Sequence, residues 1–143
     1  MIKTVNFGIL TKHYIKYQEG IVTINDKKNE FVEKLEPLKI AMSTIIDASQ
    51  RGEEITQQKE EEFKLLQDNA IELDNEFKAT VGKMNTDFSK EIYEDLSIII
   101  NEWSITKTDI DMVIDNGEVV YSKPELDITN DILEILKEKG LYI

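Results

Sequence analysis

The sequence predicts an α+β fold in which a long antiparallel helical hairpin is attached to a small β body. Apolar residues recur every three or four positions over most of residues 14–103, and strand-like segments flank this region on both sides. A turn-forming cluster at residues 49–53 divides the periodic region, and two helices joined by a short turn pack antiparallel. We therefore expect a β-rich body formed by residues 1–10 and 108–143, and a helical arm formed by residues 11–107.

The composition of the 143-residue chain excludes several classes of function. Its net charge is −12, so it lacks a basic surface to neutralise phosphates, and we expect no nucleic-acid partner. It has no cysteine, which excludes a disulfide framework and a thiolate zinc site. No apolar run approaches the ~20 residues of a membrane span, so we expect no direct membrane contact. Met1 leads straight into a strand-like segment, and no signal peptide is visible.

The first element along the chain is a short strand. Apolar and polar residues alternate over residues 2–7, and Gly8 ends the alternation. Thr11 is a candidate N-cap for the first long helix, because its hydroxyl can accept a bond from a first-turn N–H. Nine of the ten seam positions of that helix are apolar, with the spacing of a coiled coil. These positions are Tyr14, Tyr17, Ile21, Ile24, Lys28, Phe31, Leu35, Leu38, Met42 and Ile45.

The second long helix follows Gly52 and has an apolar seam of its own. Glu53 and Glu54 fall in its first turn, where the helix dipole favours negative charge. Steps of three and four continue as far as Trp103, so this seam can face the first one. Its positions are Phe63, Leu66, Ala70, Leu73, Phe77, Val81, Met84, Phe88, Ile92, Leu96, Ile99 and Trp103.

Two glycines interrupt these helices. Gly20 and Gly82 each cost a helix about 1 kcal/mol relative to alanine. They are almost equally distant from the turn, which predicts that they lie at the same level of the hairpin. Two interpretations stay open, a coincidence of spacing or a hinge at which both helices bend together.

The end of the second helix predicts self-association. Residues 96–105 are apolar on nearly all sides, which is the pattern of a helix buried all round. One chain with a thin arm has little of its own to cover this segment. We therefore expect other copies of the same chain to cover it, and the protein to be a homo-oligomer.

The last third of the chain predicts a β-hairpin followed by a helix. Asn116 and Gly117 form the expected two-residue loop, because Asn-Gly is the preferred pair for a type I′ turn. Asp127 or Thr129 is expected to cap the last helix, and Gly140 to end it.

No residue pattern indicates catalysis. His13 is the only histidine, and it is either an ordinary first-turn residue or a ligand or base without a fixed partner. Asp109, Asp111 and Asp115 would share one face of a strand, which leaves open a metal site or a solvated face. The glycine and distal glutamate of a calcium loop are missing around them. We predict a protein that is not an enzyme and that has no cofactor and no metal.

The chain as a whole resembles the Skp-like chaperones of the OmpH family. The likeness rests on the strand at residues 2–6, the coiled arm, the strand at 109–115 and the helix start at 127–129. It implies a homotrimer whose strands form a central β body, with three helical hairpins around a cavity. The residues assigned to this trimer body are Val5, Phe7, Ile99, Trp103, Met112, Ile114, Val119, Tyr121, Ile132 and Leu136.

The same resemblance implies an ATP-independent holdase-type chaperone that binds unfolded, outer-membrane-type clients between the trimer arms. This chain is acidic, unlike the well-known basic members. The alternative is a structural or assembly component of a virion or cell envelope, with arms that bind one fixed partner. The implied location is the periplasm if a signal peptide was removed, and otherwise the cytoplasm or a virion. No client-binding residue is assigned.

Overall fold

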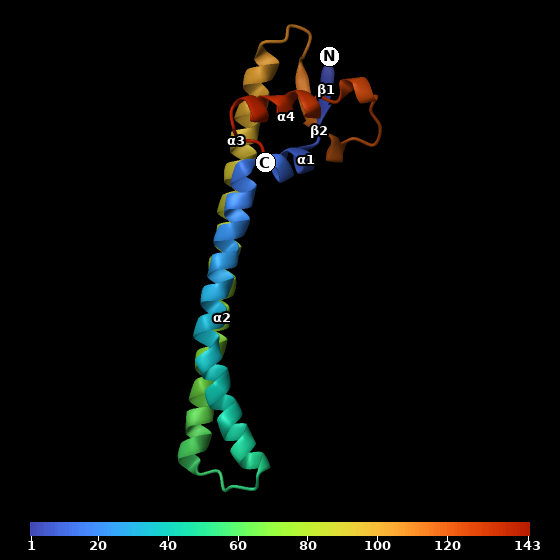
Figure 1. The fold of residues 1–143 in the computed structure, drawn as a ribbon. Coiled ribbons are helices and arrows are strands. Elements are labelled where there is room, and N and C mark those ends of the chain that lie inside the picture. The colour runs from blue at the N-terminus through green and yellow to red at the C-terminus, as the bar shows by residue number, and fades with distance from the viewer. The chain divides into compact units, whose positions relative to one another are not determined.

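The computed structural model describes residues 1–143 and divides the chain into two compact units. The first, which we call the body unit, contains residues 1–22 and 86–143. It includes the whole predicted body and adds the adjoining ends of both long helices. The second, the arm unit, contains residues 23–85. In chain order, the elements in Figure 1 are β1 (Ile2–Val5), α1 (Phe7–His13), α2 (Ile15–Gln50), α3 (Gln57–Ile105), β2 (Met112–Asp115), two 3-10 turns (Asn116–Glu118 and Pro124–Leu126) and α4 (Thr129–Glu138).

The structure confirms the predicted helical hairpin. The connection between α2 and α3 comprises residues 51–56, at the predicted turn. Gly52 has a φ of +83° there, a conformation that glycine adopts without steric cost. Thr56 caps the start of α3, because its hydroxyl accepts a hydrogen bond of 3.2 Å from the Lys59 N–H.

The arm unit is held together by the two seams. All the predicted seam residues within it are at least half-shielded from solvent except Lys28, the one polar position. The rings of Phe31 and Phe77 stack across the seam, with centroids 4.5 Å apart. Only Ala48 is fully buried in this unit. Two helices cannot surround a seam, so most of its residues stay partly exposed.

A two-stranded parallel sheet joins the two ends of the chain in the body unit. Ile2 pairs with Met112 and Val5 pairs with Asp115. Parallel strands need a long crossover connection, and here α1, α2 and α3 together form it. The backbone of β1 also receives a 2.8 Å hydrogen bond from the Ile128 N–H to the Thr4 carbonyl. The small β body is therefore built by long-range pairing.

The predicted β-hairpin at Asn116 and Gly117 is wrong. Residues Asn116–Glu118 form a 3-10 turn, and no strand follows them. Gly117 is not among the residues with positive φ, so the type I′ geometry is absent. The Asp115 carboxylate instead accepts hydrogen bonds from the Gly117 N–H and the Phe7 N–H, each at 3.4 Å. Pairing of β2 with β1 and this capping carboxylate decide the local conformation.

The first helix begins earlier than the sequence predicted. The Asn6 side chain, not Thr11, caps α1 by accepting a 3.1 Å bond from the Ile9 N–H. α1 ends at His13, and the next residue, Tyr14, has an extended backbone that forms a bridge with Tyr142. The Ile15 N–H donates to the Leu141 carbonyl at 2.8 Å, so the C-terminal segment separates α1 from α2.

The last helix ends as predicted, but its N-cap is Ile128, so neither Asp127 nor Thr129 is the capping residue that the sequence predicted. The Asp127 carboxylate accepts a 2.9 Å hydrogen bond from the Thr129 N–H at the start of α4. Gly140 has a φ of +70° just beyond its end, as a helix-ending glycine requires. Ile132 and Leu136 are fully buried, and α4 therefore anchors the body unit through one face.

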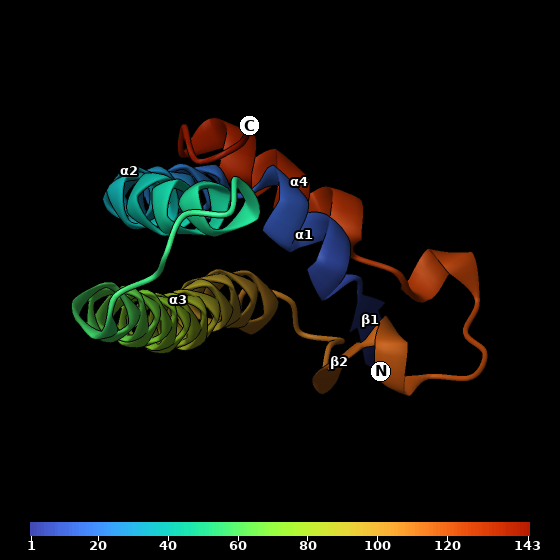
Figure 2. The same ribbon diagram turned by 90° about the horizontal axis from the view of Figure 1, so that it is seen from below.

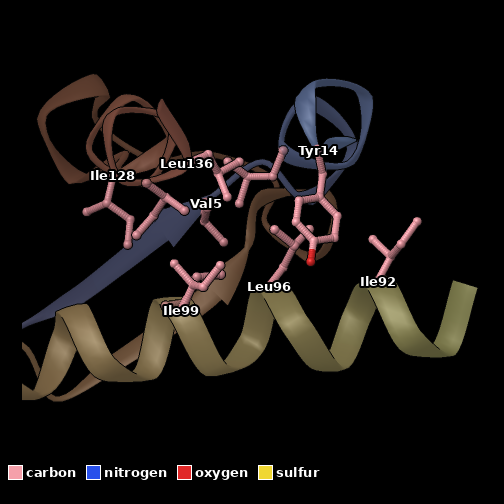
Figure 3. Close-up of a cluster of buried hydrophobic side chains, with 10 residues drawn as sticks. Val5, Tyr14, Ile92, Leu96, Ile99, Ile128 and Leu136 are labelled. Atoms are coloured by element: carbon pink, nitrogen blue, oxygen red, sulfur yellow. The ribbon is translucent and has the colours of Figure 1, made fainter. Parts of the chain in front are cut away.

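The core of the body unit gathers residues from both ends of the chain. Figure 3 shows Ile92, Leu96 and Ile99 of α3 pointing toward β1, α4 and Tyr14. In Figure 2, α1 lies beside α4 on the same side of this unit. The buried core comprises Val5, Leu10, Tyr14, Ile92, Leu96, Ile99, Ile100, Ile128, Ile132 and Leu136.

The apolar end of α3 is covered in part by its own chain, contrary to the expectation that other copies must cover it. Leu96, Ile99 and Ile100 are buried in the core of the body unit. Ile98 and Ile105 remain outside that core, with 56% and 75% of their surface exposed. Within this segment, Ile98 and Ile105 are therefore the apolar residues that are exposed to a second copy of the chain.

Candidate functional site

The body unit has an open groove between the end of α3 and the strand pair. Its volume is about 420 Å³. Phe7 and Tyr93 stack at one end of it, with ring centroids 5.2 Å apart. Ile105 and Met112 border the groove and expose more than half of their surface. Ser97, Asn101 and Asp111 also line it, so the groove is an uncovered surface of mixed polar and apolar character.

An uncovered apolar segment follows the 3-10 turn at Asn116–Glu118. Val120 is fully exposed, and Tyr121 is 80% exposed. Figure 2 shows the loop that carries them at the edge of the body unit, away from α1 and α4. Monomeric proteins rarely expose large apolar side chains next to each other. Such grouped apolar surface is typical of an interaction site.

The residues assigned to a trimer body fall into three groups in this chain. Val5, Ile99, Ile132 and Leu136 are buried in the core of their own body unit. Phe7, Trp103, Ile114 and Val119 are half-buried. Met112 and Tyr121 are exposed, and they alone present most of their side chain to a second molecule.

A polar network fastens the start of α2 to α3 within the body unit. The Tyr14 hydroxyl donates a 2.7 Å hydrogen bond to Asp95, and the Lys16 ammonium donates to the same carboxylate oxygen at 2.7 Å. Lys16 also bonds Glu91 at 2.9 Å. Figure 3 shows the Tyr14 ring directed toward α3, near Leu96 and Ile92. No sequence pattern pairs Tyr14 with Asp95, so reasoning from the sequence missed this network.

The network shifts the acid–base behaviour of its members. Burial and the hydrogen bond to Asp95 raise the pKa of Tyr14 to about 12. The hydrogen bonds from Lys16 and Tyr14 lower the pKa of Asp95 below its ordinary value. The bonds to Asp95 and Glu91 raise the pKa of Lys16. The network therefore favours the charged forms of Asp95 and Lys16.

The comparison with protein families decides what kind of protein this is. Residues 2–136 match the family model described as outer membrane protein (OmpH-like). The chain belongs to the OmpH-like family. The match spans both the body unit and the arm unit, and it confirms the resemblance inferred from the sequence. Family membership indicates a chaperone-type function. A comparison with curated protein sequences found no match.

A groove also follows one side of the seam in the arm unit of this OmpH-like chain. Phe31 and Phe77 contribute to its floor, and Lys34 and Glu76 stand on opposite walls. A neighbouring hollow continues the groove along Leu38 and Leu73. The predicted seam thus has a side that is open to solvent.

The two glycines proposed as a hinge have different surroundings. A Cβ on Gly20 would collide with the ring of Phe88, whereas a Cβ on Gly82 would meet no atom within 4 Å. Gly20 belongs to the body unit and Gly82 to the arm unit. The contact with Phe88 gives Gly20 a packing role that the sequence did not reveal, and the hinge remains a prediction.

Two of the residues considered for chemistry, His13 and Asp115, have structural roles in the OmpH-like chain. His13 stacks on Tyr142 with ring centroids 4.9 Å apart, and its Nδ1 lies 3.0 Å from the Ile143 carbonyl oxygen. Asp115 caps the turn that follows β2. No group of three or more metal-ligating side chains is placed to hold an ion, and none of the helices has the length and apolarity needed to cross a membrane.

Proposed function

We propose that this OmpH-like protein is an ATP-independent holdase-type chaperone that binds unfolded clients of the outer-membrane type. The observation that carries the proposal is the family match over residues 2–136, which includes the arm as well as the body. The arm supports it physically, because a two-helix hairpin leaves apolar seam surface exposed along its length. Such surface can hold a non-native chain through many weak contacts.

The proposed chaperone works as a homotrimer. Uncovered apolar residues of the body unit support this assembly, notably Ile105, Met112, Val120 and Tyr121. Three arms around one client would add their weak contacts into a high avidity. Release then needs no nucleotide, because a client that folds elsewhere withdraws the apolar segments on which binding depends.

The proposal is tested by aggregation of a β-barrel membrane protein. The urea-unfolded client is diluted into buffer without ATP, and turbidity is followed with and without the chain. We expect suppression once the chain, counted as trimers, equals the client. An acidic globular protein at the same concentration is the control for unspecific charge effects. Unchanged turbidity at several-fold excess would refute the holdase function, and copurification with one partner at fixed stoichiometry would favour an assembly role.

The location that we propose is the periplasm, by the same family likeness. Cell fractionation of the natural host, with an antibody against the chain, is the direct measurement. Recovery with periplasmic marker proteins is expected. Recovery with cytoplasmic markers, or with purified virions, would contradict this part of the proposal without affecting the holdase assay.

A further inference from the structure

The groove of the arm unit has an apolar floor between two polar walls. Two adjoining hollows of about 150 Å³ and 350 Å³ form it, and they share Lys34, Leu73 and Glu76. On α3, Glu72 and Glu76 are one helical turn apart, so they stand in a row along one wall. The floor is formed by Phe31, Leu38, Leu73 and Phe77.

The two walls differ in how their charges are satisfied. On the α2 wall, Lys27 and Lys34 both pair with Glu30, at 3.2 Å and 3.4 Å. On the α3 wall, Glu72 and Glu76 make no ion pair and no hydrogen bond. The groove therefore offers two carboxylates without partners, those of Glu72 and Glu76, opposite a wall on which two lysines share one glutamate.

The charged residues that line the groove sum to −1, because Glu30, Glu72 and Glu76 outnumber Lys27 and Lys34, and the segment that runs from the end of α2 into α3 adds more negative charge. Residues 47–76 carry ten Asp or Glu against three Lys or Arg. The resulting net charge of −7 accounts for more than half of the −12 of the whole chain. A field of this sign attracts cationic segments and repels acidic ones before any contact is made.

We propose that this groove selects cationic, amphipathic segments of non-native clients. Apolar side chains of the segment would pack on the floor near Phe31 and Phe77, and its Lys or Arg side chains would pair with Glu72 and Glu76. The inference rests on the proposed holdase function and names the class of client that the arm prefers. Like-charge repulsion supplies the discrimination against acidic segments.

Two labelled peptides of equal length and equal apolar content test the proposal, one with Lys and one with Glu at its polar positions. Fluorescence anisotropy with the full chain measures their dissociation constants. We expect the Lys peptide to bind about ten-fold more tightly at low salt, with the preference shrinking at 1 M salt because ions screen the carboxylates. Equal affinity of the two peptides would overturn the proposal.

A matched pair of variants separates the groove from general acidity. Glu72→Gln with Glu76→Gln removes two charges from the groove wall, and Glu61→Gln with Asp68→Asn removes two from exposed positions of α3 that do not line it. We expect a several-fold loss of Lys-peptide affinity in the first variant only. An equal loss in both variants would overturn the groove as the site. Circular dichroism checks that both variants fold.

The outcomes for the groove and for the holdase function are distinguishable. Suppression of client aggregation together with equal affinity for both peptides would leave the holdase function and remove the charge preference. Preference for the Lys peptide that depends on Glu72 and Glu76, without any suppression of aggregation, would keep the groove and remove the holdase function.

Discussion

Gly20 lies so close to the ring of Phe88 that this position of α2 has no room for a side chain. A Cβ built on Gly20 would be 1.9 Å from two ring carbons, far inside van der Waals contact. Phe88 also stacks on Tyr17, with ring centroids 6.2 Å apart. The glycine thus permits α2 to approach an aromatic side chain of α3 within the body unit, whether or not the helices also bend here.

Alanine at the two helix glycines should have opposite effects on stability. Gly20→Ala forces Phe88 to move, and overpacking of this kind lowers the free energy of unfolding by about 1–3 kcal/mol. Gly82→Ala meets no atom within 4 Å, and its better helix propensity should raise stability by about 0.5–1 kcal/mol. Urea denaturation followed by circular dichroism measures both. Stabilisation by Gly20→Ala would contradict the contact, and Phe88→Leu should relieve it in the double variant.

Asp95→Asn should destabilise the protein at neutral pH and have less effect in acid. The folded-state pKa of Asp95 is lowered, so its stabilisation is complete above the ordinary carboxyl pKa of about 3.9 and is lost as pH falls through the folded value. Because Lys16 is partly exposed, we expect the free energy of unfolding to fall by about 1 kcal/mol at pH 7. Urea denaturation of wild type and variant at pH 7 and pH 2.5 gives the comparison. A pH-independent difference would argue against the ion pair.

Tyr14→Phe tests the other side of the same network. The pKa of Tyr14 is raised to about 12. The contribution of its neutral hydroxyl to stability is therefore complete below about pH 10 and is lost as the pH rises through about 12. The free energy of unfolding of the variant should be lower by about 1 kcal/mol at pH 7, which is the usual net contribution of a hydrogen bond. Spectrophotometric titration of tyrosine in wild type should show one late-titrating group that is absent from the variant.

Leu96 and Ile98 lie two positions apart in α3 and have opposite exposure, so their alanine variants should differ in stability. Leu96 is fully buried, so Leu96→Ala should lower the free energy of unfolding by about 3 kcal/mol. Ile98 is 56% exposed, and Ile98→Ala should change it by less than about 0.5 kcal/mol in the dissociated chain. Thermal unfolding at low protein concentration measures both. Equal losses would contradict the placement of the core.

A charge at Val120 should dissociate the proposed homotrimer. Light scattering of wild type should give about three times the chain mass of 16.6 kDa. Val120→Asp places a carboxylate on a fully exposed apolar position, and Asn130→Asp adds the same charge to an exposed polar position of α4. We expect the monomer mass for the first variant only. A monomeric wild type at micromolar concentration would refute the trimer.

The helical arm is the part of the fold that local sequence patterns predict well. Heptad spacing is repeated over many turns, and each repeat supports the same pair of facing seams. Phe31 and Phe77 meet accordingly, and every predicted seam position of α3 is at least half-buried. Gly52 and Gly140 also have the positive φ that their places beside helix ends require.

The body unit shows where local patterns fail. Asn116-Gly117 has a strong preference for a hairpin turn, yet the parallel pairing of β2 with β1 leaves no second strand to form it. The partner of β2 comes from the opposite end of the sequence, and no local pattern contains that information. The hydrogen bond between Tyr14 and Asp95 could not be predicted for the same reason, because 81 positions separate the two residues.

The sequence by itself determined the hairpin of two long helices, the helix-ending glycines and the family of the chain, because these follow from repeated or local residue patterns. Only the tertiary structure decided which residues of α3 the chain covers itself. It also decided the parallel pairing of β1 with β2 and the contact between Gly20 and Phe88. Those features depend on contacts between segments far apart in the chain, whose free energy no short stretch of sequence encodes.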